Sequence, residues 1–257
     1  MDWESLIGLL VVAAAAGWID AVVGGGGLIQ IPALMLAVPA ASPAIALGTN
    51  KLAAICGTTS AAISYSRRTK LNWRWVAPTA ATATVSAGLG AIAALSIPGS
   101  YFRPVTMALL LLVLGFVILR PSFGLVTDTE EPDRRRMAIA TLLCGVVIGF
   151  YDGVFGPGTG TFLIISMVAL LATNFVESSA MAKVVNAGTN LGALTVFAVE
   201  GQVLWKVGLG MAVCNVIGAR LGARTALKRG AGFVRIVLVV VVVGMVLRLA
   251  SLYIWPQ

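Results

Sequence analysis

An apolar stretch near the start of the chain holds one carboxylate followed by four consecutive glycines, and a related stretch recurs in the second half. The first runs from Gly17 through Asp20 to Gly24-Gly25-Gly26-Gly27, and the second runs from Gly149 through Asp152 to Gly156-Pro157-Gly158-Thr159-Gly160. Asp20 and Asp152 are 132 positions apart, and the same offset aligns Lys51 with Lys183, Trp73 with Trp205, and Arg103 with Arg235. Shared apolar composition does not explain matches between such uncommon residues, so the sequence predicts two copies of one unit.

The apolar runs that surround these stretches are long enough to cross a bilayer. Hydrophobic residues make up 59% of the chain and charged residues only 11%, whereas about a quarter of a typical soluble domain is charged. Since about 20 apolar residues in a helix span the hydrocarbon core, we expect an all-α polytopic membrane protein with about 8–10 transmembrane segments. The expected helices cover residues 5–23, 28–38, 43–65, 76–96, 104–119, 137–155, 160–172, 178–198, 207–223 and 233–254.

The charged loops predict how the two copies are oriented. Basic residues in the loops at 67–74 and 134–136 belong on the cytoplasmic side. In the second copy the equivalent loop is nearly neutral, and the basic turn at 224–229 comes one helix later. We therefore expect two inverted-topology repeats, which are typical of secondary transporters. The first repeat would cover 1–119, a cytoplasmic linker 120–136 and the second repeat 137–257, within a single integral membrane domain whose N-terminus is extracytoplasmic.

The composition also argues against several other functions. The net charge is +8, but the basic residues lie in short loops between apolar runs, so we expect a lipid bilayer and no nucleic acid as the partner. The chain has no histidine, and its three cysteines lie far apart in apolar runs. We expect no metal site and no cofactor. With no nucleophile paired to a base, we do not expect an enzyme.

The glycine breaks are the first candidate for a binding site. Glycines inside a membrane segment leave backbone amides unpaired, so such a stretch must be buried in protein or face a cavity. Exposed amides at the start of a helix attract anions. Two breaks from inverted repeats would meet near the middle of the bilayer. The alternative is that the glycines only allow helices to pack closely. The sequence does not show whether the short pieces after the breaks span the membrane or fold back.

Lys51 and Lys183 are the second candidate, because a lysine at the centre of a membrane helix costs about 2.5–3.5 kcal/mol and needs a partner or a function. Polar residues lie on the same helical faces at spacings of three, four or seven, namely Thr58 with Lys51, and Asn186 and Asn190 with Lys183. One interpretation is a cationic site rich in hydrogen-bond donors. The other is a structural ion pair within each repeat, joining Lys51 to Asp20 and Lys183 to Asp152. The two are compatible, and the aspartates could also bind a coupling proton.

The predicted anion site combines the breaks with the polar faces of the lysine helices. Its residues are Gly24, Gly25, Gly26, Gly27, Asn50, Lys51, Thr58, Gly156, Gly158, Lys183, Asn186, Thr189 and Asn190, with Asp20 and Asp152 as coupling or ion-pair residues. Trp73 and Trp205 are expected to anchor helices at the membrane interface. Arg103 and Arg235 are expected near the headgroups, while Arg220 could belong to either an interface or an anion pathway.

These residues resemble the sulfite exporter TauE/SafE family, also called the four-toluene-sulfonate-uptake permease superfamily. The resemblance rests on residues 17–29 with Pro32, on Ala46-Leu47-Gly48-Thr49-Asn50-Lys51-Leu52, on residues 183–194 and on residues 218–224. It covers nearly the whole chain and both repeats. The chain departs from the family's usual glycine-rich second motif at Pro157, which removes one amide donor.

The resemblance implies an inner-membrane permease for small sulfur-containing anions such as sulfite, sulfoacetate or other organosulfonates. Such a permease would work by alternating access. The alternative is an uncoupled anion channel, or a permease for another small organic or inorganic anion. The sequence does not indicate which anion moves, in which direction, whether a proton or a sodium ion is coupled, or the oligomeric state.

Overall fold

The first half of the chain folds into four helices in the computed structural model, which describes residues 3–97, 108, 111 and 133–254. They are α1 (Trp3–Val23), α2 (Gly27–Ala37), α3 (Pro43–Ser66) and α4 (Trp73–Ala94). Ser42 caps α3 by accepting a hydrogen bond from the Ile45 amide at 3.2 Å, and Pro43 occupies the first turn, where its missing N–H costs nothing. The helix expected at 104–119 lies outside the described residues, apart from positions 108 and 111.

The second half follows the same order. A nearly continuous rod is formed by α6 (Arg134–Thr141), the π-helical turn η2 (Leu142–Val147) and α7 (Ile148–Val154), and is followed by α8 (Thr159–Leu171), α9 (Phe175–Val199) and α10 (Trp205–Ile254). No strand occurs in the described ranges, in agreement with the predicted all-α class.

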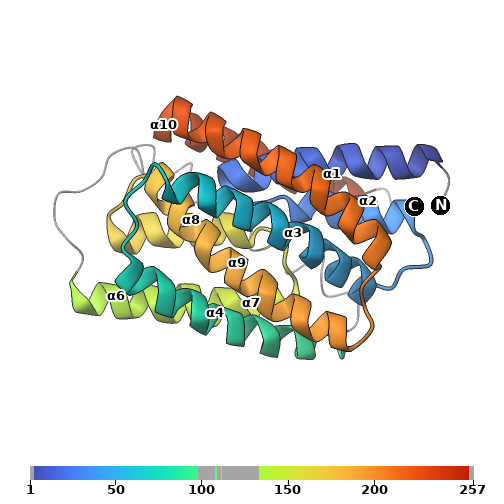
Figure 1. The fold of residues 1–257 in the computed structure, drawn as a ribbon, viewed down its shortest axis with the longest axis horizontal. Coiled ribbons are helices and arrows are strands. Elements are labelled where there is room, and N and C mark those ends of the chain that lie inside the picture. The colour runs from blue at the N-terminus through green and yellow to red at the C-terminus, as the bar shows by residue number, and fades with distance from the viewer. Residues whose placement is uncertain (1–2, 98–107, 109–110, 112–132, 255–257) are drawn as a thin grey trace.

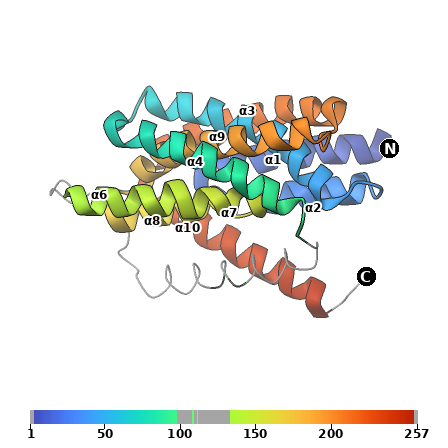
Figure 2. The ribbon, with the colours of Figure 1, turned by 90° about the horizontal axis from the view of Figure 1, so that it is seen from below.

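Several boundaries differ by a few residues from the sequence-based expectation, and two of these differences have identifiable reasons. Asn174 and Glu177 form a reciprocal capping box, so α9 begins three residues earlier than expected. The basic turn expected at 224–229 is instead helical, and α10 bends only at Gly230, whose φ of 77° and ψ of −174° suit glycine alone. Figure 2 shows the segment after this bend turning away from the rest of the bundle.

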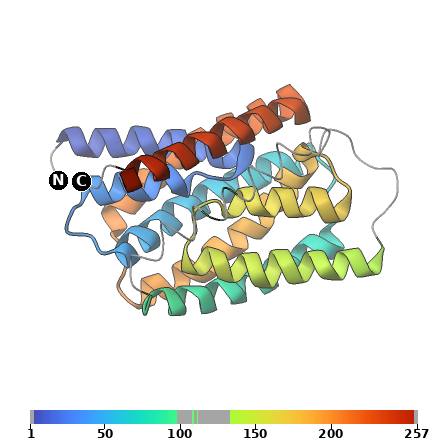
Figure 3. The same ribbon diagram turned by 180° about the vertical axis from the view of Figure 1, so that it is seen from behind.

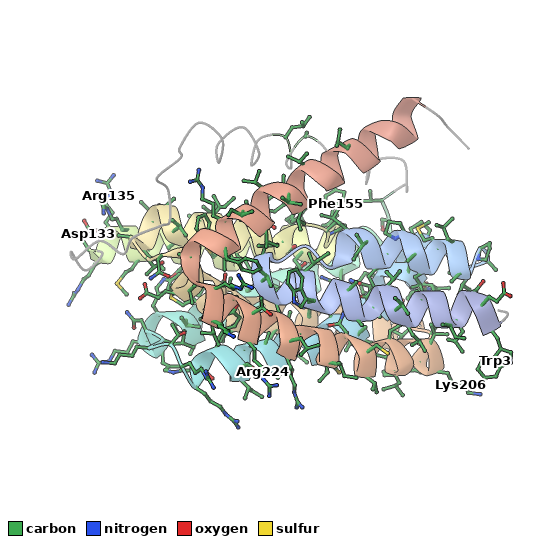
Figure 4. The ribbon with its side chains drawn as sticks, turned by 90° about the horizontal axis from the view of Figure 1, so that it is seen from above. Trp3, Asp133, Arg135, Phe155, Lys206 and Arg224 are labelled. Atoms are coloured by element: carbon green, nitrogen blue, oxygen red, sulfur yellow. The ribbon has the colours of Figure 1, made fainter. Side chains whose placement is uncertain are left out.

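The two halves run in opposite directions through the molecule. In Figure 1, α1 starts beside the N-terminus at one end of the long axis, whereas α6 starts at the opposite end. The helices α3 and α9 likewise run in opposite directions, as do α4 and the first part of α10. This arrangement agrees with the expectation of inverted repeats. Figure 4 shows Asp133 and Arg135 at one end, and Trp3 and Lys206 at the other.

The helices differ in whether they can cross a membrane. The spans Trp3–Val23, Trp73–Ala94 and Arg134–Val154 are long and apolar enough by length and composition. The apolar helices α2 and α8 have 11 and 13 residues, which at 1.5 Å per residue gives roughly 16 and 20 Å, too short for a bilayer. Figures 1 and 3 show both starting near the middle of the long axis and ending toward opposite ends. The short pieces after the glycine breaks therefore do not cross the membrane alone.

Small residues let the long helices of the two halves pack closely. A side chain at Gly222 of α10 would collide with Trp18 of α1, and one at Gly90 of α4 would collide with the backbone of Phe150 in α7. These contacts are related by the 132-residue offset. On the outside, Leu89, Val213 and similar large apolar side chains are exposed, as expected for surfaces that face lipid.

Candidate functional site

Left-handed backbone ends both broken helices at equivalent positions. Gly24 follows α1 with a φ of +70°, and Gly156 follows α7 with a φ of +83°. Gly158, which caps α8, also has a φ of +83°. A residue with a side chain is strained in this region, whereas glycine is not. The glycines thus allow each chain to stop one helix and begin another inside the bundle, and Phe155, just before the second break, lies near the middle of the molecule in Figure 4.

The two breaks are in direct backbone contact. The Thr161 amide of α8 donates to the Gly24 carbonyl at 2.9 Å, and the Thr161 hydroxyl donates to the Val23 carbonyl at 2.9 Å and to the Gly24 carbonyl. A side chain at Gly24 would overlap the backbone of Gly160. The carbonyls at the end of α1 are therefore bound by the start of α8, which joins the repeats at their centre.

The buried lysines form ion pairs that cross between the repeats. The distance from Lys51 Nζ of α3 to Asp152 Oδ2 of α7 is 2.7 Å, and that from Lys183 Nζ of α9 to Asp20 Oδ2 of α1 is 3.1 Å. The alternative predicted from the sequence, Lys51 with Asp20 and Lys183 with Asp152, is wrong in its partners. The inverted repeats interlock, so each lysine meets the carboxylate of the other repeat.

Hydroxyl and amide groups surround these ion pairs. The Thr159 hydroxyl donates to Asp152 Oδ1 at 2.6 Å, and Lys183 Nζ also donates to the Asp20 carbonyl. The Asn190 amide donates to the Thr58 hydroxyl at 3.4 Å, a contact between residues at equivalent positions of the two repeats. Thr189 donates to both the carbonyl and the side-chain oxygen of Asn186, at 2.9 and 3.1 Å. Most polar atoms in this region are therefore paired.

A small cavity lies where the breaks and the lysine helices meet, with about 290 Å³ of space between its lining atoms when open solvent is included. Eleven of the fifteen residues predicted from the sequence line it: Asp20, Gly25, Gly26, Gly27, Asn50, Lys51, Asp152, Gly156, Gly158, Asn186 and Asn190. The other four predicted residues lie just behind this lining. Gly24 packs on Gly160, Lys183 binds Asp20, Thr58 contacts Asn190, and Thr189 binds Asn186.

Three lining residues were missed by the sequence reasoning, namely Ala54, Thr159 and Gly160. Ala54 carries no chemical signal, but the 132-residue offset places it opposite Asn186, which was predicted. Thr159 and Gly160 belong to the second glycine break and could have been included on that ground. The cavity is therefore asymmetric, with an amide in one repeat where the other has a methyl group.

The electrostatics of the cavity favour a small anion. The helices α2 and α8 begin at lining or adjacent residues, so the positive ends of both helix dipoles face the cavity. Among the described residues, the amides of Gly25 and Gly26 have no hydrogen-bond acceptor. The Asn50 amide nitrogen, which is also a donor, lies beside Gly27. The buried Asn50 Oδ1, which is an acceptor and does not bind an anion, has no partner within the described part of the chain. The ammonium group of Lys51 lines the cavity, and that of Lys183 lies directly behind the lining residue Asp20.

The remaining predicted residues lie away from the cavity. Trp73 and Trp205 are about half exposed at the first residues of α4 and α10, as expected for helix-end anchors. Arg220 Nε donates to the Ser60 hydroxyl at 3.0 Å, which ties α10 to α3. Arg103 lies outside the described residues.

Comparisons with known proteins agree with this architecture. The sequence profile of the family described as "Sulfite exporter TauE/SafE" matches residues 9–249. A "Probable membrane transporter protein ORF9" from a Sinorhizobium species is 39% identical over 95% of this chain and 91% of its own length. The "Probable membrane transporter protein YfcA" from Escherichia coli K12 is 38% identical over 92% of this chain and 86% of its own. No solved structure matches. The chain is a multi-pass membrane transporter that belongs to the sulfite exporter TauE/SafE family.

Proposed function

We propose that the protein is a secondary transporter that carries small sulfur-containing anions, such as sulfite, sulfoacetate or other organosulfonates, across the inner (plasma) membrane. The two repeats would rock against each other so that the central cavity faces the two sides in turn. The N-terminus would lie on the extracytoplasmic side, because the end that holds Arg135 and the loop at 67–74 is the basic one.

The observation that carries this proposal is the meeting of two broken helices and two buried lysines at one small cavity. Amides at helix starts and an ammonium group together supply the donors that a sulfite or sulfonate group accepts from. The cavity is small, because apart from open solvent it leaves room for little more than a water-sized group. The site therefore suits a small oxyanion better than a large organic molecule.

The contacts between repeats also support alternating access. Both ion pairs and the Thr161 hydrogen bonds join one repeat to the other. A rocking motion would break and remake these interactions rather than those inside each repeat. Anion binding at the lysines would therefore be coupled to the motion, since the anion competes with the carboxylates for the ammonium groups.

Counterflow in proteoliposomes tests this function. Vesicles loaded with unlabelled sulfite or sulfoacetate are expected to exchange it for labelled anion outside, which a carrier does and an uncoupled channel does not sustain. Lys51→Gln is expected to lower the exchange rate at least about tenfold, as loss of one charged donor in a buried site costs about 1.5–3 kcal/mol. Lys206→Gln, which removes an exposed ammonium at the start of α10, is the matched control and should exchange normally.

The single variant leaves Asp152 buried without its partner, so a second variant separates folding from function. Lys51→Gln combined with Asp152→Asn removes both charges and is expected to fold yet still fail to exchange anion. No exchange by the wild type with any sulfur anion would refute the proposed function. Normal exchange by the folded double variant would show that Lys51 does not bind the anion.

A further inference from the structure

The two carboxylates of the site are equivalent in sequence position but not in environment. Asp152 is 2% exposed, lies 2.7 Å from Lys51 and also accepts the Thr159 hydroxyl. Asp20 is 17% exposed and lies 3.1 Å from Lys183. Within the described ranges, Lys183 is the only side chain that binds the Asp20 carboxylate. Asp20 lacks the hydroxyl partner because Gly27 stands in the first repeat where the second has Thr159.

Charge balance in the cavity limits how an anion can bind. Two lysines and two aspartates make the site neutral overall. A monovalent anion would leave one uncompensated negative charge inside the bundle, where burying an unpaired charge is costly. A proton bound together with the anion restores neutrality. If the proton goes to a carboxylate, the lysine beside it is freed to hold the anion.

We propose that Asp20 binds this proton, so that the protein moves one proton together with each monovalent anion. The inference rests on the proposed function and adds the coupled ion and its site. Both carboxylates line the cavity, but Asp20 is more exposed and loses only one side-chain partner when it is protonated, whereas Asp152 is almost fully buried and held by two groups. The protonated Asp20 releases Lys183, whose Nζ lies just behind Gly160 at the cavity wall.

A proton fits this position better than a sodium ion does. Lys183 Nζ already contacts both the carboxylate and the backbone carbonyl of Asp20. A sodium ion bound to those same oxygens would lie beside the ammonium and be repelled by it. A proton instead neutralises the carboxylate and adds no charge next to the lysine.

The other charged groups around Asp20 do not compete for this role. The helices packed on α1 are α2, α3, α8, α9 and α10, of which α2 and α8 contain no ionisable side chain. From α9 and α3 come Lys183 and Lys51, and Tyr65 of α3 donates its hydroxyl to the Ala21 carbonyl at 2.9 Å. Asp152 of α7 lies across the cavity. From α10, Arg220 is exposed and bound to Ser60. None of these groups therefore replaces Asp20 as the proposed proton site.

The test uses methanesulfonate, which stays ionised and cannot carry a proton itself, in proteoliposomes that contain a pH-sensitive dye. Wild-type protein is expected to acidify the lumen as methanesulfonate enters. A pH one unit higher inside should concentrate the anion about tenfold at equilibrium. Because the pair of ions is neutral, the membrane potential should have no effect.

Asp20→Asn mimics the protonated carboxylate, and any methanesulfonate flux that it retains is expected not to acidify the lumen. Its net uptake should now respond to voltage, approaching about fifty-fold accumulation at 100 mV, inside positive. Asp152→Asn is the matched control at the equivalent position, and any flux that it retains should still carry protons.

The outcomes separate this inference from the proposed function. Three results would each overturn the inference but leave the transport function standing. They are methanesulfonate entry without acidification in the wild type, accumulation driven by a sodium gradient at equal pH, and unchanged proton movement in Asp20→Asn. Sulfite movement without methanesulfonate movement would also overturn it. Absence of movement for both anions would refute the transport function as well.

Discussion

The buried ion pair between Lys51 and Asp152 allows a quantitative test of the central packing. We consider Lys51→Met, which keeps most of the side-chain volume and removes the charge. The side chains of Lys51 and Asp152 are 1% and 2% exposed and 2.7 Å apart. The substitution leaves the carboxylate without its counter-charge and with only the Thr159 hydroxyl as a side-chain partner. The free energy of unfolding is expected to fall by about 3–5 kcal/mol, the usual cost of breaking a buried pair from one side.

Two further variants test whether this loss of stability comes from the unpaired charge of Asp152. Removing both charges, as Lys51→Met with Asp152→Asn, is expected to stay within about 1 kcal/mol of wild type, since a buried pair contributes little net stability over neutral groups. Lys183→Met should cost less than Lys51→Met, because Asp20 is 17% exposed and can be solvated from the cavity. The three results together would show that the cost comes from an orphaned charge.

The measurement is reversible unfolding of the purified protein in mixed micelles by increasing fractions of a denaturing detergent, followed by tryptophan fluorescence. A double-mutant cycle gives the coupling energy between Lys51 and Asp152, expected to be at least about 2 kcal/mol. The reasoning would be refuted by a loss below about 1 kcal/mol in Lys51→Met, or by a larger loss in Lys183→Met than in Lys51→Met.

Two more predictions concern the contact between the breaks. Gly24→Ala should prevent correct folding, since the new side chain would overlap the Gly160 backbone. In the equivalent Gly156→Ala the new side chain finds its nearest neighbour at 3.5 Å, so this variant should lose only the roughly 1–2 kcal/mol of stability that a left-handed backbone costs. Size-exclusion profiles and unfolding measurements would compare the two proteins, and equal behaviour would contradict this difference. Thr161→Val removes the hydroxyl that binds the Val23 and Gly24 carbonyls and should cost about 1–3 kcal/mol, while Thr195→Val, an exposed threonine bonded only within its own helix, serves as the control and should unfold like wild type.

Much of this architecture is readable from the sequence for simple physical reasons. Apolar runs of membrane length must become helices because lipid offers no partner for backbone amides. A carboxylate and a run of glycines at matched positions indicated where two of those helices break. The loop charges indicated inverted halves, and the directions of α1 and α6 agree. Most residues predicted for the site line one cavity because the polar faces of membrane helices avoid lipid and turn inward.

The sequence alone determined the helices, the repeat, the breaks and which polar residues avoid lipid, because each follows from local hydropathy and residue type. Only the tertiary structure decided which carboxylate each lysine meets. In principle, each lysine could pair with the aspartate of its own repeat or with that of the other repeat. Both arrangements obey the 132-residue repeat, so the repeat alone does not distinguish them. The choice depends on how the two repeats interlock around the Gly24–Gly160 contact, which brings Lys51 to Asp152 and Lys183 to Asp20. The unequal exposure of the two aspartates, 17% for Asp20 and 2% for Asp152, is likewise a property of the tertiary structure.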